Sequence, residues 1–169
     1  MAMQMPEITV RSVPRVAHEL AKSSGFLLAR LGMGFKTKAI ARADEAGFEL
    51  YDYSVLAILG EGIRETQSTI AATLSLDPSR LVALLDSLEE RDLIVRQRDP
   101  HDRRRHVVSI TPTGRRELVK LRALIRKLEE EFLAPLDPEE RRQFHELLVR
   151  LACQNDPACA FAETSEERR

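Results

Sequence analysis

Residues 76–93 read LDPSRLVALLDSLEERDL and contain the clearest helix signal in the sequence. Asp77 is a favourable N-cap, and Pro78 follows at the first helical position, where proline suits a helix start. Four leucines repeat at helical spacing on one side of this helix, namely Leu81, Leu84, Leu85 and Leu88. The opposite side carries small residues and a single long cation. We therefore predict a helix that buries one face and leaves the other open to a partner.

A second short helix is predicted immediately before this one. Thr66 can cap a helix over 67–74, and Ser75 and Leu76 leave room only for a turn. Two helices with so short a connection indicate a helix-turn-helix. At 100° per residue, the outward positions of its second helix are Ser79, Arg80, Val82, Ala83 and Asp86.

The periodicity changes after Arg91. Residues 93–97 and 106–110 are rich in β-branched side chains and flank a charged segment, which indicates a β-hairpin. Residues 91–105 include six arginines and three aspartates, whereas the whole chain has a formal charge of −1. Such a local excess is typical of an edge that binds a polyanion. A small-faced helix can enter a DNA major groove while an arginine-tipped hairpin reaches the adjacent minor groove, so we predict a winged helix that binds double-stranded DNA.

Long helical patterns flank this region. Before it, Leu27, Leu31, Phe35 and Ala39 form an apolar stripe that indicates one helix of about 25 residues beginning at Pro14. After it, a coiled-coil-like seam consists of Leu118, Leu121, Ile125, Leu128 and Phe132. Pro135 ends that helix, and residues 137–140 form a capping box for a last one. The seam could be monomer core, but we favour dimerisation because the winged region closes its own core.

The predicted fold is therefore mainly α with a small β-hairpin wing (α+β), a winged helix-turn-helix flanked by long dimerisation helices. We expect an N-terminal arm and first dimerisation helix over 1–48 and the DNA-binding lobe over 49–112. The C-terminal dimerisation helices would occupy 113–153, and a polar tail 154–169.

Three segments together resemble the multiple antibiotic resistance regulator (MarR) family of bacterial transcription factors. They are residues 76–93, Arg98-Asp-Pro-His-Asp-Arg-Arg-Arg105 and Ile110-Thr-Pro-Thr-Gly114, and the resemblance extends from about Pro14 to Ala152. It implies a homodimer that binds a pseudo-palindromic operator, most often as a repressor released by a small ligand. Asp92 stands where the family usually has glycine, and aspartate tolerates the positive φ that this position requires.

The resemblance also assigns roles to individual residues. Asp102 and Arg104 match the wing-tip pair in which the aspartate orients an arginine inserted in the minor groove, and Ser79, Arg80 and Ala83 match positions of the recognition helix. The full DNA-binding set that we expect is Ser68, Pro78, Ser79, Arg80, Val82, Ala83, Arg98, Asp102, Arg103, Arg104 and Arg105.

Members of the family commonly respond to small, often anionic aromatic ligands. The candidate ligand-binding residues are Arg15, His18, Arg30, Tyr51 and Tyr53, which offer hydrogen-bond donors and aromatic walls. The alternative is that the tyrosines are ordinary half-buried core residues and that the charges are simply solvated.

Other chemistry has weaker support. Cys153 and Cys159 form no C-x-x-C pair and adjoin no cation, so we expect inert thiols, with thiol-based oxidant sensing as an alternative. A winged-helix protein-interaction module without DNA binding is a further alternative. We expect no enzyme, no cofactor and no metal site, because no nucleophile with a base, phosphate loop or ligand spacing is present. Without an apolar run of about 18 residues or a signal segment, we expect a cytoplasmic protein with no membrane partner.

Overall fold

The computed structural model describes residues 15–62, 65–98 and 106–159, and the chain divides into two units, residues 1–37 and 38–169. The first unit contains α1 (His18–Ala21) and the beginning of α2 (Ser24–Glu45). The prediction of one uninterrupted helix is therefore wrong at its N-terminal end, and Pro14 lies outside the described residues. The reason is local, because the Ser23 hydroxyl accepts a hydrogen bond from the Phe26 amide at 3.2 Å and caps a new helix.

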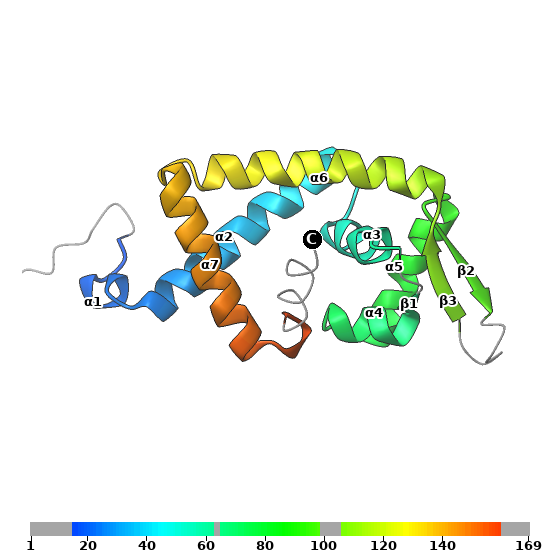
Figure 1. The fold of residues 1–169 in the computed structure, drawn as a ribbon, viewed down its shortest axis with the longest axis horizontal. Helices are drawn as coiled ribbons and strands as arrows, with labels where there is room; N and C mark the ends of the chain where they lie inside the picture. Colours follow the sequence, from blue (N-terminus) through cyan, green and yellow to red (C-terminus); the bar gives the residue numbers. More distant parts are fainter. Residues whose placement is uncertain (1–14, 63–64, 99–105, 160–169) are drawn as a thin grey trace, which may run out of the picture. The chain divides into compact units, whose positions relative to one another are not determined.

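The second unit contains the predicted winged helix (Figure 1). Its elements are α3 (Leu50–Gly60), β1 (Glu65–Thr66), α4 (Gln67–Thr73), α5 (Pro78–Glu90), β2 (Ile94–Arg98) and β3 (His106–Ile110). The hairpin strands are antiparallel with Ile94 opposite Ile110 and Arg98 opposite His106. The sheet has the order β1-β3-β2, so a third strand joins the predicted hairpin. Sequence reasoning missed β1 because two residues are too few to show a periodicity.

One hydrophobic core holds this winged unit together. All four leucines predicted to face inward from α5 are buried. The rest of the fully buried core comes from the neighbouring helices and strands and includes Val55, Leu56, Leu59, Ile70, Ile94, Val108, Leu118 and Leu121. Leu118 and Leu121 lie on α6 (Pro112–Phe132), where Leu128 is also buried. Three of the five predicted seam residues are therefore buried within a single chain, which favours the monomer-core alternative for the seam.

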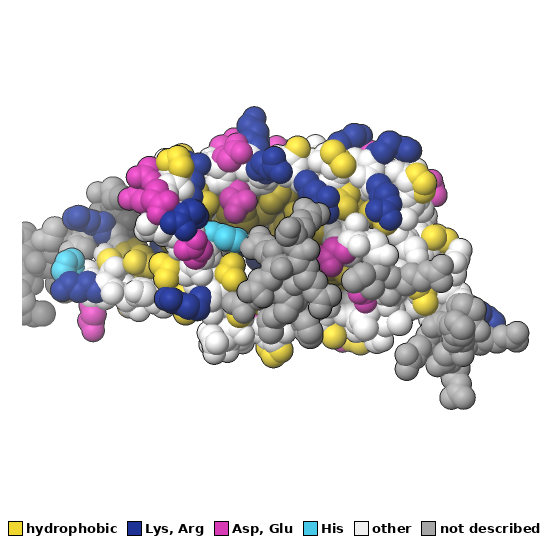
Figure 2. All heavy atoms as spheres, viewed as in Figure 1, with side chains coloured by type: hydrophobic (Ala, Val, Ile, Leu, Met, Phe, Trp, Pro, Cys, Tyr) yellow, Lys and Arg dark blue, Asp and Glu magenta, His cyan; other side chains and the backbone are white. Residues whose placement is uncertain are grey.

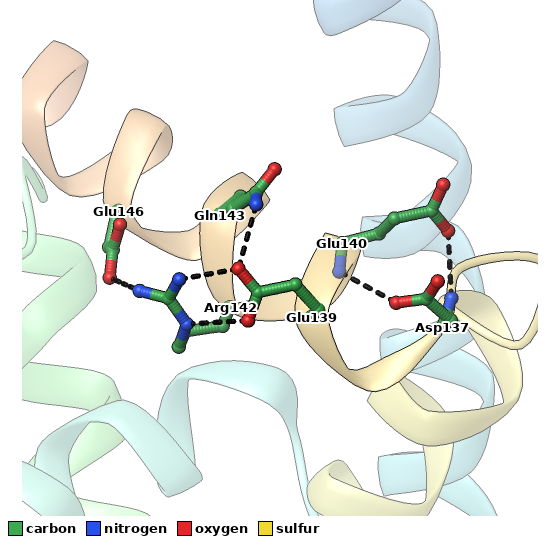
Figure 3. Close-up of polar contacts among 6 residues, drawn as sticks. All are labelled: Asp137, Glu139, Glu140, Arg142, Gln143 and Glu146. Atoms are coloured by element: carbon green, nitrogen blue, oxygen red, sulfur yellow. Dashed lines mark hydrogen bonds and ion pairs between the residues drawn. The ribbon is translucent and has the colours of Figure 1, made fainter.

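The last elements of the described residues are α7 (Pro138–Asn155) and the short η1 (Pro157–Cys159). Figure 3 shows the predicted capping box at the start of α7, in which the Asp137 amide donates to Glu140 Oε2 at 2.8 Å and the Glu140 amide donates to Asp137 Oδ1 at 2.9 Å. The box is therefore confirmed. Unlike α6, α7 has no buried residue, and the side chains of Leu147 and Leu151 are 49% and 53% exposed. The expected polar tail over 154–169 falls largely on residues 160–169, outside the described part.

The junction between α5 and the wing has the backbone geometry expected from the sequence. Asp92 has a φ of 54°, in the left-handed region that its glycine-like position requires. Thr111 Oγ1 donates to the Asp92 carbonyl oxygen at 2.6 Å, and Thr113 Oγ1 donates to the Asp92 carboxylate at 3.2 Å. The start of α6 therefore stabilises the turn that leads into β2.

Candidate nucleic-acid interface

The two helices of the helix-turn-helix begin at the predicted caps. The Thr69 amide donates to Thr66 Oγ1 at 3.2 Å at the start of α4, and the Ser79 amide donates to Asp77 Oδ1 at 2.8 Å at the start of α5. Between the helices, Ser75 has a φ of 51°, which lets the chain reverse within a few residues. These contacts fix the N-terminus of α5, the end that would approach base edges.

The outward face of α5 is arranged as predicted. Ser79, Arg80, Val82 and Ala83 are exposed, and Pro78 and Ser68 are also exposed at the starts of their helices. Asp86, the fifth outward position, is only partly exposed because it pairs with a wing residue. The face that remains open to a partner is therefore small and mostly uncharged.

Arg80 has a contact that sequence reasoning did not predict. Its guanidinium lies over the Tyr51 ring, with 4.9 Å between Cζ and the ring centroid. This distance is within the range of a cation–π interaction. The structure thus brings together a residue predicted to contact DNA and a residue predicted to contact a ligand. Both belong to the winged unit, so α3 directly supports the only cationic side chain of α5.

The wing is fastened to α5 through Arg96, which lies on β2. Its backbone amide donates to Glu89 Oε1 at 2.8 Å, and its side-chain Nε and Nη2 donate to Glu89 Oε2 at 2.8 and 2.6 Å. Nη2 also lies 2.6 Å from Asp86 Oδ1. These side-chain and backbone hydrogen bonds from Arg96 lower the pKa of Glu89, and the hydrogen bond with Glu89 is the main cause of the raised pKa of Arg96. The recognition helix and the wing are therefore positioned relative to each other by an ion-pair network.

Sequence reasoning counted Arg96 among the cations of the wing and missed this role. A signal was present, because Asp86 and Glu89 are three residues apart on α5 and therefore share a face. What the sequence could not show is that β2 passes beside that face.

Replacing Arg96 with glutamine should lower the free energy of unfolding by about 1 kcal/mol at neutral pH, since the pairs are partly exposed to solvent. Glu89 has a lower pKa in the folded state, so its contribution is present above the ordinary glutamate pKa of about 4.3 and is lost as the pH falls toward the lowered value. Urea unfolding of wild type and variant at neutral and acidic pH measures the difference. Arg98→Gln is the control, because Arg98 is exposed at the end of β2. A difference that does not shrink in acid would contradict this account.

The tip of the wing is only partly described. Arg98 is exposed at the end of β2 and His106 is exposed at the start of β3. Four of the predicted DNA contacts, Asp102, Arg103, Arg104 and Arg105, belong to 99–105 and lie outside the described residues. Their assignment stays a prediction.

Positive charge is also concentrated on α6, which the sequence prediction did not include in the DNA-binding surface. Residues 115–127 of α6 include six cations and one acidic residue, Glu117, which pairs with Lys120 at 2.7 Å. Figure 2 shows Lys and Arg side chains along this helix. By contrast, Arg91 and Arg96 form ion pairs with carboxylates of their own chain. The field that would steer a polyanion toward the molecule therefore includes α6 as well as the wing.

The predicted ligand residues fall into the two units. Arg15, His18 and Arg30 belong to the first unit and are exposed. Tyr51 and Tyr53 belong to the second, where both are partly buried and pack against the hydrophobic core. This packing supports the reading of the tyrosines as half-buried core residues, while their role toward a ligand stays a prediction.

Both cysteines have polar contacts, and those of Cys159 oppose its ionisation. Cys153 Sγ donates to the Cys159 carbonyl oxygen at 3.2 Å, and Cys159 Sγ lies 3.7 Å from Asp156 Oδ2. Burial, and then the nearby Asp156 carboxylate, raise the pKa of the Cys159 thiol. Because the thiolate is the reactive form, the raised pKa of Cys159 supports the expectation of an inert thiol at that position, and the role of Cys153 stays a prediction.

Two further features concern the described residues alone. No group of three or more His, Cys, Asp or Glu side chains among them is arranged to hold a metal ion. Within the same ranges, none of the helices has the length and apolar character needed to cross a bilayer.

A hollow of about 610 Å³ lies between α4 and α5. Its lining includes Ser68, Ala71 and Ala72 from α4, Leu76 from the turn, and Val82 from α5. His106 of β3 also lines it. The hollow therefore lies on the helix-turn-helix itself and is bordered by the start of the second wing strand.

A model described as the MarR family matches residues 47–105 of the chain, which include the helix-turn-helix and most of the wing. Among known relatives, the putative transcriptional regulatory protein for the hcr operon of Thauera aromatica is 33% identical over 103 residues. That alignment covers 61% of this chain and 62% of the relative, less than two thirds of the relative's length.

Solved structures match over more of the chain. A MarR-family transcriptional regulator from Rhodococcus sp. RHA1 is 31% identical with a TM-score of 0.71, and the match covers 80% of this chain and 98% of that one. The transcriptional repressor CouR, solved with a 23-mer DNA duplex, is 28% identical with a TM-score of 0.73, covering 83% and 99%. CouR from Rhodococcus jostii RHA1, bound to p-coumaroyl-CoA, is 29% identical with a TM-score of 0.68, covering 80% and 96%.

Proposed function

Because the chain belongs to the MarR family of transcriptional regulators, we propose that it binds operator DNA as a homodimeric repressor and leaves the DNA when a small ligand binds. The observation that carries this proposal is the fastening of the wing to α5 by Arg96, Glu89 and Asp86. These contacts hold a helix that suits the major groove beside a hairpin that suits the minor groove.

The proposed DNA contacts are those expected from the sequence. The exposed face of α5, from Pro78 to Ala83, would lie in the major groove, and Ser68 would contact the backbone from the start of α4. The wing would enter the adjacent minor groove with Arg98 and residues 102–105. A narrow minor groove has a strong negative potential that favours arginine.

The proposed dimer follows from the helices that the chain leaves uncovered. Leu147 and Leu151 of α7 are about half exposed, and no residue of α7 is buried within the single chain. A helix with an uncovered apolar stripe is best stabilised by a second copy of the chain. Two recognition helices related by a two-fold axis would then fit a pseudo-palindrome with half-sites about one helical turn apart.

The proposed ligand is an aromatic acid or its thioester. The support is the structure of CouR with p-coumaroyl-CoA, together with the donors and aromatic rings offered by Arg15, His18, Arg30, Tyr51 and Tyr53. A ligand that expels DNA must bind the DNA-free dimer better, by the same factor by which it weakens DNA binding. We assign the chain no catalytic role and place it in the cytoplasm, where it would meet the chromosome.

The experiment is a titration of the full chain against the DNA upstream of its own gene, followed by addition of p-coumarate or p-coumaroyl-CoA. Wild type should bind specifically, and Arg104→Ala should weaken binding by about tenfold or more, since it removes one groove contact from each half-site. Arg142→Ala is the matched control, because Arg142 pairs with Glu139 and Glu146 on the exposed surface of α7.

Each outcome bears on one part of the proposal. Unchanged affinity in Arg104→Ala would reject the wing contact. Specific binding that neither compound releases would reject the ligand class and leave oxidant sensing as the alternative. A failure to bind any DNA specifically would reject the function and favour a protein-interaction module.

A further inference from the structure

We infer that Val82 recognises the 5-methyl group of thymine in the major groove, so that an apolar contact specifies a T·A pair in each half-site. The inference rests on the proposed DNA binding and adds a sequence preference to it. Thymine is the base that presents a methyl group at the major-groove edge, and apolar side chains contact that group in protein–DNA complexes.

The first support is the position of Val82 on α5. Its side chain is 43% exposed, while the leucines of the same helix are buried. Its neighbours on the open face, Ser79 and Ala83, are small. Val82 is therefore the bulkiest apolar group that α5 presents to a partner, and small neighbours allow the helix to approach closely.

The second support is the hollow that Val82 lines. Ala71 and Ala72 line its α4 side, Leu76 lies in the turn, and Ser68 adds a hydroxyl. Among the described residues, the lining includes no Lys, Arg, Asp or Glu, and its polar members are Thr66, Gln67, Ser68, Ser75 and His106. A hollow that combines apolar side chains with neutral hydrogen-bonding groups suits the edge of a base pair with a methyl group better than it suits a phosphate.

The third support is the position of Arg80, the only cation of α5. An arginine on a recognition helix usually reads guanine through its two acceptors. Here the guanidinium stacks on Tyr51 at 4.9 Å, and Arg80 does not line the hollow. The described residues that remain for recognition within the hollow are Val82 and its apolar neighbours, which can contact a methyl group, and the neutral polar groups of Gln67, His106 and the hydroxyls.

The test uses a DNA duplex that the full-length protein selects from a random-sequence pool. Each thymine of the duplex is replaced by deoxyuridine, symmetrically in both half-sites, which removes the methyl group and preserves base pairing. The affinity of every duplex is then measured for wild type, Val82→Ala and Val119→Ala. Val119→Ala is the matched control, because Val119 is a 64% exposed valine on α6, outside the helix-turn-helix.

One deoxyuridine pair should weaken wild-type binding by about fifteenfold, which is about fourfold in each half-site for one buried methyl group. Val82→Ala should bind the thymine duplex more weakly than wild type and should respond less than about twofold to the same replacement. Val119→Ala should respond like wild type. The signature is the coupling between the two γ-methyl groups that Val82→Ala removes and one methyl group on the DNA, which a loss of folding would not produce.

Three outcomes would overturn the inference. One is specific DNA binding that no thymine replacement weakens. Another is equal sensitivity of wild type and Val82→Ala at every position. A third is saturable binding of benzoate that Val82→Ala abolishes while the response to deoxyuridine is unchanged, which would assign the hollow to a ligand. If the pool yields no bound duplex, the proposed function itself fails, and that failure is distinct from these three.

Discussion

Replacing Gly114 with alanine is expected to lower the free energy of unfolding by about 3 kcal/mol or more, since inserting a methyl group into a packed core is destabilising and the neighbour here is backbone. An ideal Cβ at this position would lie 2.0 Å from the Leu93 carbonyl oxygen and 2.9 Å from Ile110 Cγ1. The carbonyl cannot easily move away, because it accepts hydrogen bonds from both the amide and the hydroxyl of Thr111, at 3.0 and 3.1 Å. Glycine is therefore required at position 114, because the first turn of α6 packs closely against the backbone of Leu93, the residue before β2.

Urea unfolding followed by circular dichroism measures this effect. Gly34→Ala is the matched control, because Gly34 is also a helical glycine and a Cβ there would meet no atom within 4 Å. We expect the control to lose no more than about 1 kcal/mol. Equal losses at the two glycines would show that the backbone contact at Leu93 does not decide the result.

The second large effect is expected at Asp52, whose side chain is 2% exposed. Its Oδ2 accepts hydrogen bonds from Arg91 Nη1 at 3.0 Å and from the Glu49 amide at 2.9 Å. Asp52→Ala removes both bonds and leaves the Arg91 guanidinium without its carboxylate. Because the arginine side chain is 35% exposed, we expect a loss of about 2 to 3 kcal/mol, less than for a fully buried pair.

Urea unfolding tests this prediction with an exposed ion pair as the comparison. Arg42 and Glu131 lie 3.1 Å apart with both side chains more than two fifths exposed, so Glu131→Ala should cost less than about 1 kcal/mol. Asp52→Asn should fall between Asp52→Ala and wild type, since the amide oxygen can still accept one hydrogen bond. If Asp52→Ala lost no more than Glu131→Ala, burial would not be what makes this pair important.

The local elements of the winged unit could be predicted from the sequence because their signals lie within a few residues of each other. Thr66 and Asp77 are the N-caps of α4 and α5, as predicted. The four inward leucines of α5 are buried, as expected from their spacing. The positive φ at Asp92 was also predicted, because the family that the sequence resembles usually has glycine there and aspartate tolerates this conformation. Helix caps and helical periodicity are local properties, and tertiary packing did not override them here.

The contacts that organise the site could not be predicted because they join residues far apart in the chain. Arg91 pairs with a carboxylate 39 positions earlier, and Arg80 stacks on a ring of α3. A count of arginines cannot distinguish a side chain that is available to DNA from one that is already paired. The break between α1 and α2 was missed for another reason, since a serine cap at Ser23 interrupted an otherwise continuous apolar stripe.

The internal pairing of arginines also limits how strongly salt can act on operator binding. A guanidinium that neutralises a DNA phosphate releases condensed cations from the duplex, and the number released sets how steeply affinity falls with salt concentration. Two of the six arginines between residues 91 and 105 already have carboxylate partners in their own chain. At most four per half-site can therefore contribute to ion release from this segment unless an internal pair breaks. The number of arginines in this segment that would neutralise DNA phosphates is therefore smaller than the number of arginines in its sequence.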